Sequence, residues 1–442
     1  MEGLLKTLRE KVEQAEVYHL KTSTVPVAFH SGKLESIKNK AIEGMALRVI
    51  DGNRLGFATT TDMKDPSELI TAAIASAAFG EETVFSFPMA ADPTHPEVHD
   101  RAVTDLSEEE MIAVGERVIT KLHDAEPEAD VNLTIAKAVE TVEIRNTAGC
   151  EVEEERTHFS LWVEAGKTRE GDIFLLFAGD DTRFQEDLSA DTLVDRLIRY
   201  LRYGEKIVHA PSKRLPVVFT PYGAITLLLP LIVGFNGKSV HMGISPLKDR
   251  VGEKVFDPRF SLADDGTLTR GPRSSGFDDE GTPTKRTPLV SDGVINGFLY
   301  DLRTAALAEA KPTGNGYKGG LLGSGGFRTP PSVGVGNVLV SVGDKDENEI
   351  IDGIEEGLLV ESVLGLGQGN INTGEFSNNV AVAFKIERGK IVGRVKNTMI
   401  AGNTYALLKD HLIALSNAAG WAHGTLHTPA IAVDQVNVVG QG

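Results

Sequence analysis

The chain has 442 residues, 41% of them hydrophobic and 24% charged, which is typical of a globular protein with two or three domains. Its formal net charge of −18 argues against a role that depends on wrapping nucleic acid, because phosphate binding needs clustered lysine and arginine. The single cysteine, Cys150, excludes an intrachain disulfide and a cysteine-rich metal site. The N-terminus has no uninterrupted apolar run, so we expect a cytoplasmic protein without a membrane role.

The N-terminal part of the sequence alternates strand and helix patterns. Asp51-Gly52-Asn53 is typical of a hairpin turn, and Ser107 followed by Glu110 is the pattern of a capping box. Apolar periodicity predicts helices over residues 2–14, 67–79, 107–123 and 191–202, and strands over 17–22, 25–30, 44–50, 55–60, 131–135, 139–144, 159–164 and 173–178. The order strand, turn, strand, helix occurs at 44–79 and again at 159–202, which fits either an internal duplication or a common arrangement.

Residues 216–237 contain no charged side chain. Residues 217–219 predict a buried strand, and 224–233 predict a helix that is apolar all round. Because this segment is shorter than a membrane span, we expect a core helix that is kinked or broken near Pro230. It has no His, Cys, Asp or Glu, so it can neither ligate a metal nor transfer a proton.

After residue 213, short strand patterns and glycine turns dominate. We expect strands over 287–290, 294–300, 337–342, 380–386, 391–395 and 431–439, and helices over 347–356 and 404–415. The glycine-rich tract 313–336 is not a phosphate loop, because Gly320 stands where that motif needs lysine. We interpret it as a loop that lines a cleft. The nucleophile motif G-x-S-x-G does not occur.

Two polar clusters stand out in this part. Asp278, Asp279 and Glu280 are three adjacent carboxylates before a glycine and a proline; they could bind a cation or a peptide amine, or cap backbone donors in a turn. His423 and His427 are the only close histidine pair and could hold zinc on a helix, although Gly424 and Pro429 favour a loop.

Several segments together resemble the TldD/PmbA family. The most specific is FDDEGTP at residues 277–283, followed by LVSDGVINGFL at 289–299; further similar segments lie at 44–49, 56–58, 313–316, 343–344, 373–377 and 400–403. The resemblance covers essentially the whole chain. It implies an α+β fold, in which a mixed α/β N-terminal region with helices on twisted sheets precedes a β-rich domain of curled, mainly antiparallel sheet. We expect an N-terminal domain at 1–84, a linker at 85–106, a middle α/β domain at 107–207 and a C-terminal domain at 213–442.

The resemblance also implies two kinds of subunit. The TldD kind resembles a zinc peptidase, in which HExxxH on a helix supplies two zinc ligands and a general base and a later cysteine completes the ligand set. Here the matching helix reads LLLPLIV at 227–233, and GWA at 420–422 stands where the cysteine is expected. The chain therefore resembles the PmbA kind, also called TldE and also described as a modulator of DNA gyrase. We expect no catalytic residue, metal ligand or cofactor in it, and zinc only in a TldD-type partner.

These observations leave three hypotheses. The first is a non-catalytic or regulatory subunit that pairs with a TldD-type zinc metallopeptidase and helps to enclose a cleft for unfolded or short peptides, held by added-strand pairing. The second is a homodimeric peptide-binding module without a catalytic partner. The third is an enzyme with a relocated metal site at His241, His423 and His427. The residues we expect at the peptide cleft are Asp278, Asp279, Glu280, His241, Asn315 and Asn337.

Overall fold

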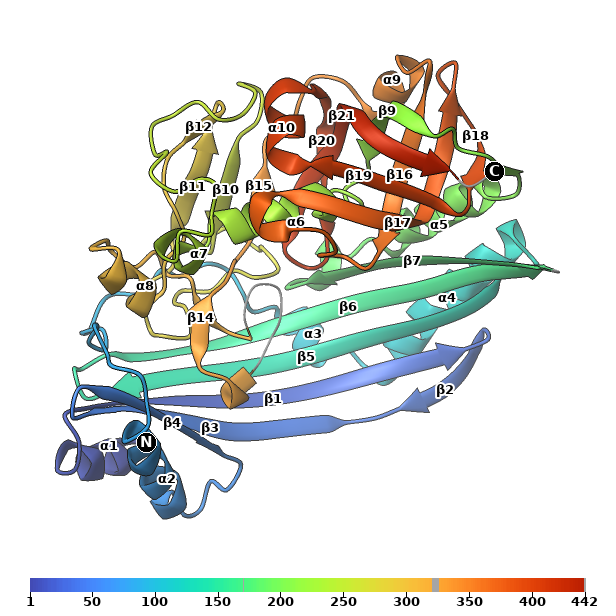
Figure 1. Cartoon of the computed structure of the whole chain (residues 1–442). Coiled ribbons are helices and arrows are strands. Elements are labelled where there is room, and N and C mark those ends of the chain that lie inside the picture. Colours follow the sequence, from blue (N-terminus) through green and yellow to red (C-terminus); the bar gives the residue numbers. More distant parts are fainter. Residues whose placement is uncertain (170, 320–325, 441–442) are drawn as a thin grey trace.

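The computed structural model describes residues 1–169, 171–319 and 326–440. Two sheets organise them: one built from the N-terminal strands and one from the C-terminal strands, the latter lying above the former in Figure 1. Most strand pairs in both sheets are antiparallel, and the helices lie against the sheets. The predicted α+β fold is therefore confirmed.

The N-terminal sheet is built around one long strand, β1 (Gln14–His30), which pairs antiparallel with β3 (Lys40–Asp51) and β5 (Asp130–Asn146). The predicted breaks inside β1 and β5 are wrong. The polar residues in the break of β1, such as Ser23, have strand partners on both sides, so the backbone ladder continues through them. The strand order is β4-β3-β1-β5-β6-β7 with β2 beside β1, and the other bounds are β2 (Lys33–Ile37), β4 (Arg54–Thr60), β6 (Glu151–Arg169) and β7 (Asp172–Thr182).

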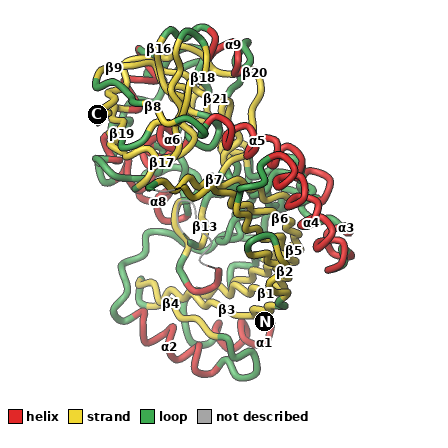
Figure 2. Tube along the Cα trace, turned by 90° about the vertical axis from the view of Figure 1, so that its right-hand side faces the viewer, coloured by secondary structure: helices red, strands yellow, loops and turns green. Residues whose placement is uncertain are grey.

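The two faces of this sheet have different neighbours, because side chains alternate along each strand. On β6, Phe159 and Leu161 pack on the helices, whereas Arg156 and His158 point to the opposite face. Ser107 and Glu110 form the predicted capping box at the start of α4. The helices of this part are α1 (Glu2–Arg9), α2 (Ser67–Ala77), α3 (Arg101–Asp105), α4 (Glu108–Ala125) and α5 (Ala190–Tyr203), with a 3-10 turn η1 (Gln185–Asp187). Figure 2 shows α4 and β13 (Gly316–Lys318) on opposite sides of the sheet.

The sheet runs without interruption through the predicted N-terminal and middle domains. β1 and β5, which come from these two parts of the chain, pair over fourteen residues from Glu16 to Phe29. A boundary between them therefore does not coincide with a sheet edge, and the predicted domain division stays a prediction. Within the predicted linker, Thr94 contacts the C-terminal part, where its backbone N–H donates to the Gly276 carbonyl at 3.2 Å.

The C-terminal sheet contains twelve of the described strands. Its main order is β12-β11-β10-β15-β21-β9-β16-β17-β18-β8, with β19 and β20 paired to neighbours, and three of its pairings are parallel. Its bounds are β8 (Ile207–Val208), β9 (Lys213–Phe219), β10 (Leu262–Asp265), β11 (Arg286–Ser291), β12 (Val294–Ile295), β15 (Val338–Val340), β16 (Glu356–Leu364), β17 (Glu375–Glu387), β18 (Lys390–Val395), β19 (Thr398–Asn403), β20 (Leu412–Ala422) and β21 (Leu426–Gly440).

The helices of the C-terminal part are short. The predicted helix over 404–415 is half wrong: it ends at Asp410 as α10 (Thr404–Asp410), and β20 takes over because its residues pair with β21. A separate ribbon joins β13 to β14 (Pro331–Val333). The remaining elements are α6 (Ile225–Gly234), α7 (Gly237–His241), α8 (Leu302–Leu307), α9 (Glu347–Asp352), η2 (Gly326–Arg328) and η3 (Ile371–Thr373).

Helix α6 lies in the core, as predicted. Leu227, Leu228 and Leu231 are fully buried in the largest hydrophobic cluster. Of the predicted kink or break near Pro230, a break is excluded, because the helix continues through this residue to Gly234. The Pro230 carbonyl accepts a hydrogen bond from the Tyr405 hydroxyl. No described helix is long and apolar enough to cross a membrane.

The two sheets are joined by α5, which packs on both. Leu197 and Leu201 share a hydrophobic cluster with Phe159 of the N-terminal sheet and Phe384 of the C-terminal sheet. The Tyr200 and Phe384 ring centroids lie 5.3 Å apart. This shared core fixes the position of one sheet relative to the other, and with it the geometry of the space between them.

Candidate functional site

The acidic side chains of residues 277–283, a segment that we call the signature turn, accept hydrogen bonds from backbone N–H groups of the protein. The Asp278 carboxylate accepts hydrogen bonds from the backbone N–H groups of Glu280 and Thr282, both at 2.9 Å, and of Gly316 at 2.8 Å. Asp279 accepts one from the Lys318 N–H at 2.8 Å. Burial raises the pKa of both carboxyl groups, and these donors oppose the rise. The turn thus anchors β13.

Glu280 connects this turn to the N-terminal sheet. Its Oε1 accepts a hydrogen bond from Arg48 Nη1 at 2.7 Å, and its Oε2 accepts one from the Leu302 N–H at 2.7 Å. Arg48 also pairs with Glu16 of β1, at 2.8 Å from Nε. All three side chains are buried. Burial raises the pKa of both glutamates, and Arg48 opposes that rise.

Asn315 and Asn337 have structural partners as well. Asn315 Nδ2 donates to Asp264 Oδ2 at 2.6 Å, and Asn337 Nδ2 donates to the Asp265 carbonyl at 2.7 Å. Asn337 Oδ1 accepts from the Arg273 N–H at 3.0 Å. Both side chains are fully buried, so they fix the loops around the signature turn and are not exposed to a ligand.

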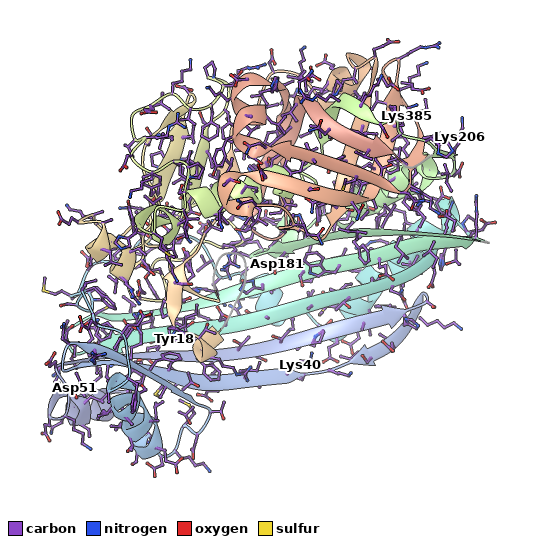
Figure 3. All side chains as sticks on the ribbon, viewed as in Figure 1. Tyr18, Lys40, Asp51, Asp181, Lys206 and Lys385 are labelled. Carbon is purple, nitrogen blue, oxygen red and sulfur yellow. The ribbon has the colours of Figure 1, made fainter. Side chains whose placement is uncertain are left out.

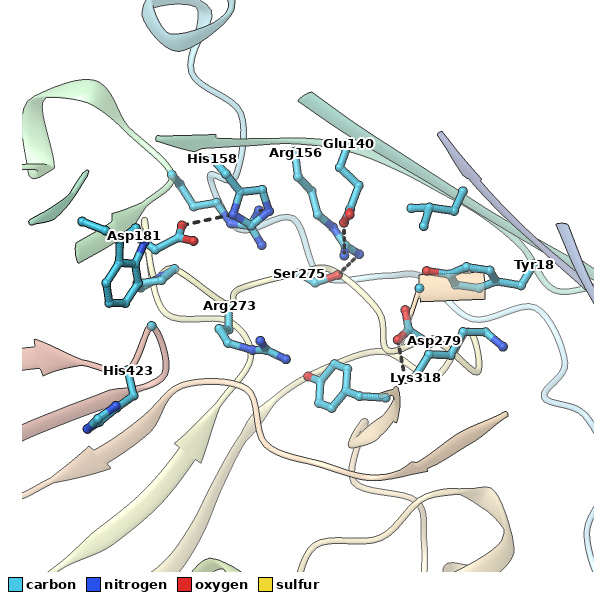
Figure 4. A pocket seen from close by; sticks show the side chains of 17 residues that line it. Tyr18, Glu140, Arg156, His158, Asp181, Arg273, Ser275, Asp279, Lys318 and His423 are labelled. Atoms are coloured by element: carbon cyan, nitrogen blue, oxygen red, sulfur yellow. Dashed lines mark hydrogen bonds and ion pairs between the residues drawn. The ribbon is translucent and has the colours of Figure 1, made fainter. Parts of the chain in front are cut away.

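A cavity of about 240 Å³, which we call the interdomain cavity, lies between the two parts of the chain. One wall comes from β1, β5, β6 and β7, and the other comes from residues 272–279, from 317–318 and from the turn at 423–424. Figure 3 shows Tyr18 and Asp181 on the side of the sheet that faces the C-terminal part, and Figure 4 shows the cavity from close by. Of the residues predicted at the peptide cleft, Asp279 lines this cavity.

The lining of the cavity is rich in charge. Arg156, from β6, donates to Glu154 Oε2 at 2.6 Å and to Ser275 Oγ at 2.5 Å, and lies 3.6 Å from Glu140. His158 Nδ1 lies 3.2 Å from Asp181 Oδ1. The lining also contains a cation–π contact, in which the Lys318 ammonium lies 4.7 Å from the Tyr18 ring centroid. The cavity is therefore both polar and aromatic, which is the character of a ligand site.

Two cations in the lining of the cavity, Lys318 and Arg183, have lowered pKa values. Burial, together with the Arg48 charge, lowers the pKa of Lys318 to about 8. Burial, together with the Arg156 charge, lowers the pKa of Arg183 to about 10. Desolvated cations that crowd one another are stabilised by an added anion.

The histidines of the third hypothesis do not come together. His241 is exposed at the end of α7 and does not line the cavity. His423 Nε2 faces the Tyr222 carbonyl at 3.0 Å, whereas the His427 ring packs on Trp421 with 4.8 Å between centroids. Across residues 1–169, 171–319 and 326–440, no group of three or more His, Cys, Asp or Glu side chains is arranged to hold a metal ion.

Sequence reasoning missed most of the cavity. Arg156, His158, Arg183 and Arg273 lie outside the predicted elements, and the fold brings them together from distant parts of the sequence. One local signal was available: Arg156 and His158 alternate with apolar residues on β6, so they had to share a face. Of the predicted glycine-rich tract, Tyr317, Lys318 and Gly326 line the cavity, while 320–325 lie outside the described residues.

Comparisons with known proteins agree with this architecture. A model of the PmbA/TldA metallopeptidase C-terminal domain matches residues 212–440, and a model of the PmbA/TldA metallopeptidase domain 1 matches residues 15–77. A metalloprotease of Methanothermobacter thermautotrophicus is 26% identical over 424 residues, covering 92% of this chain and 89% of the relative.

Solved structures show the same fold. The crystal structure of TldE from Thermococcus kodakarensis superposes with a TM-score of 0.90 at 22% identity, over 100% of both chains. A Thermotoga maritima protein described as a proposed modulator of a DNA gyrase superposes with a TM-score of 0.85 at 23% identity, over 99% of both chains. The C-terminal family model alone spans more than half of the 442 residues. The chain therefore belongs to the TldD/PmbA family of metallopeptidase-related proteins.

Proposed function

We propose that this chain is the PmbA/TldE-like, non-catalytic subunit of a TldD-type zinc metallopeptidase acting on unfolded or short peptides. The observation that carries the proposal is the composition of α6. The resemblance implies that a TldD-type zinc peptidase carries two histidines and a glutamate on this helix. In this chain the helix carries leucines instead, and Leu227, Leu228 and Leu231 are fully buried. A general base or a metal-ligating side chain introduced on α6 would disrupt the packing of the hydrophobic core.

An exposed apolar face supports assembly with a partner. On β7, Ile173 is 65% exposed and Phe177 is 61% exposed, and Trp162 of the neighbouring strand is 44% exposed on the same face. Contiguous exposed apolar side chains on a sheet are characteristic of surfaces that another protein covers. We assign this face to the TldD-type subunit. The single, buried cysteine is consistent with the cytoplasm as the compartment.

The test is hydrolysis of an unfolded peptide by the purified chain, by a TldD-type chain with an intact HExxxH, and by the mixture. We expect the chain alone to be inert and the mixture to be more active than the TldD-type chain alone. Zinc-dependent cleavage by this chain alone would overturn the proposal.

The same preparation tests the interface. Phe177→Asp places a charge on the apolar face and should weaken assembly, measured by light scattering after size exclusion. Phe79→Asp is the matched control, because Phe79 is 92% exposed just beyond α2 and away from that face. If the chain forms a tight homodimer through Phe177 and gains nothing from a TldD-type chain, the homodimeric peptide-binding module is correct instead.

A further inference from the structure

The interdomain cavity contains two guanidinium groups, those of Arg183 and Arg273, that have no carboxylate partner among the described residues. Its lining includes Arg156, Arg183, Arg273 and Lys318, together with the acids Glu140, Asp181 and Asp279. Arg156 is paired with Glu140 and also with Glu154, which lies 2.6 Å away; Asp181 lies beside His158, and Asp279 accepts from the Lys318 N–H. Two guanidinium groups without carboxylate partners in one enclosed space indicate a site for an anion.

Arg183 is the clearest of these cations. Its side chain is only 3% exposed, yet its described hydrogen-bond partners are neutral: the Thr157 carbonyl at 3.2 Å, His158 Nε2 at 2.6 Å and the Ser274 carbonyl at 3.3 Å. Its Nε is buried and has no hydrogen-bond partner among the described residues. A buried guanidinium that lacks an anion is costly, and a carboxylate or phosphate bound in the cavity would stabilise its charge.

Arg273 approaches from the opposite wall. Figure 4 shows its side chain extending into the middle of the cavity, between Asp181 and Asp279. Within the described part of the chain, its guanidinium forms no ion pair or hydrogen bond, and only its backbone N–H is engaged, by Asn337 Oδ1. Donors from both parts of the chain therefore converge on one space.

The size and surroundings of the cavity limit the kind of ligand that it can bind. At about 240 Å³ it is smaller than the roughly 300–1,000 Å³ of typical small-molecule sites, so it accommodates the end of a chain rather than a whole peptide. Trp162 lines both this cavity and a second hollow of about 320 Å³ on the open face of β5 and β6, which also includes Phe177. In the chain without a partner, a peptide whose end enters the cavity can continue over this apolar hollow.

We propose that the interdomain cavity binds the C-terminal carboxylate of a peptide, with Arg183 and Arg273 as the guanidinium donors and Tyr18 and Trp162 beside the last side chain. A planar carboxylate matches the paired donors of a guanidinium. The peptidic nature of the ligand rests on the proposed function, whereas the anion site rests on the geometry of the cavity alone.

The experiment uses the full chain without any partner. Isothermal titration compares an N-acetylated tripeptide ending in phenylalanine with the same peptide as its C-terminal amide, and with inorganic phosphate. We expect the acid to bind at least about tenfold more tightly than the amide, because a charge-assisted hydrogen bond contributes about 1.5–3 kcal/mol. Equal affinity for acid and amide overturns the proposal, and so does tighter binding of phosphate than of the acid.

Variants locate the site. Arg273→Gln should lower affinity for the acid at least about tenfold and leave affinity for the amide unchanged, and its fold should be intact because the guanidinium has no partner among the described residues. Arg117→Gln is the matched control, since Arg117 is exposed on α4, on the opposite face of the sheet. An unchanged acid affinity in Arg273→Gln overturns the site. Absence of partner-dependent hydrolysis contradicts the proposed function but leaves this binding result standing.

Discussion

Arg48 of β3 and Glu280 of the signature turn form a buried ion pair, 2.7 Å long, between residues 232 positions apart in the sequence. Burial disfavours the charge on Arg48, but Glu16 and Glu280 together keep its pKa above the ordinary value. The guanidinium therefore lies between two buried carboxylates, one from each part of the chain. Arg48 therefore links the N-terminal sheet to the signature turn.

We expect Arg48→Met to lower the free energy of unfolding by about 3–5 kcal/mol, because it leaves Glu16 and Glu280 buried without their cation. The measurement is urea denaturation followed by circular dichroism. Adding Glu16→Gln and Glu280→Gln to Arg48→Met should recover part of the loss, since the carboxylates are then neutral.

The control for this pair is Lys121→Met, which removes a cation from exposed pairs with Asp191 and Asp195. Exposed ion pairs contribute little, so its stability should stay close to that of the wild type. A stability loss in Arg48→Met no larger than in Lys121→Met would contradict a structural role for the Arg48–Glu280 pair.

Gly56 lets α2 approach β4 more closely than any side chain allows. A Cβ at this position would lie 2.1 Å from the Ala73 carbonyl oxygen and 2.9 Å from the Ala77 nitrogen, both of them helix backbone. Since backbone cannot rotate away as a side chain can, Gly56→Ala should displace α2 and lower stability by about 1–3 kcal/mol. Thermal or urea denaturation measures the change. Gly297→Ala is the control, because nothing lies within 4 Å of a Cβ there; equal stability of the two variants would contradict the close approach.

Cys150 should be unreactive in the native protein. It is buried beneath the signature turn, where its Sγ lies 3.8 Å from the Gly281 carbonyl oxygen. Burial first, and then the Glu16 and Asp278 charges, raise the pKa of the thiol to about 11, so little nucleophilic thiolate exists at neutral pH. Ellman's reagent should label it rapidly only after denaturation. Rapid labelling under native conditions would mean that the signature turn separates readily from the N-terminal sheet.

The sequence contained enough information for the fold class and for most elements with a strong local signal. Ser107 and Glu110 form the capping box that their spacing predicts, and the hairpin at 51–53 is confirmed by the β3–β4 pairing. The continuity of the strands was not predictable, because polar residues such as 23–24 are held by partners elsewhere in the chain rather than by local preference. The error after Asp410 has the same origin, since pairing with β21 decides the structure of β20.

The candidate site was less accessible from sequence. The signature turn was recognised, but the sequence left open whether its acids contact a ligand or cap backbone donors; in the structure Asp278 and Glu280 accept from backbone donors and from Arg48. Local composition does not reveal whether a carboxylate has buried partners. The cavity cations could not be grouped either, because Arg183 and Arg273 are ninety positions apart in the sequence and meet only through the docking of the two sheets.

Asp264 should give the protein a pH-dependent stability. Burial raises the pKa of its carboxyl group from 3.8 to about 7, against the opposing donors Asn315 Nδ2 and the Gly336 N–H. Between these two values the folded state binds a proton that the unfolded state has released. The free energy of unfolding contributed by this group therefore falls as the pH rises from about 4 to about 7, by at most about 1.4 kcal/mol per pH unit, and is constant above that range.

Asp264→Asn removes this titration, so its stability should fall less steeply than that of the wild type over the same pH range. At every pH it should also lose about 1–3 kcal/mol, because the amide nitrogen then faces the Asn315 or Gly336 donor. Urea denaturation at a series of pH values measures both effects. Asp344→Asn makes the same chemical change at an exposed position and serves as the control. Parallel pH profiles for the wild type and Asp264→Asn would mean that Asp264 stays ionised in the fold, held so by its two donors.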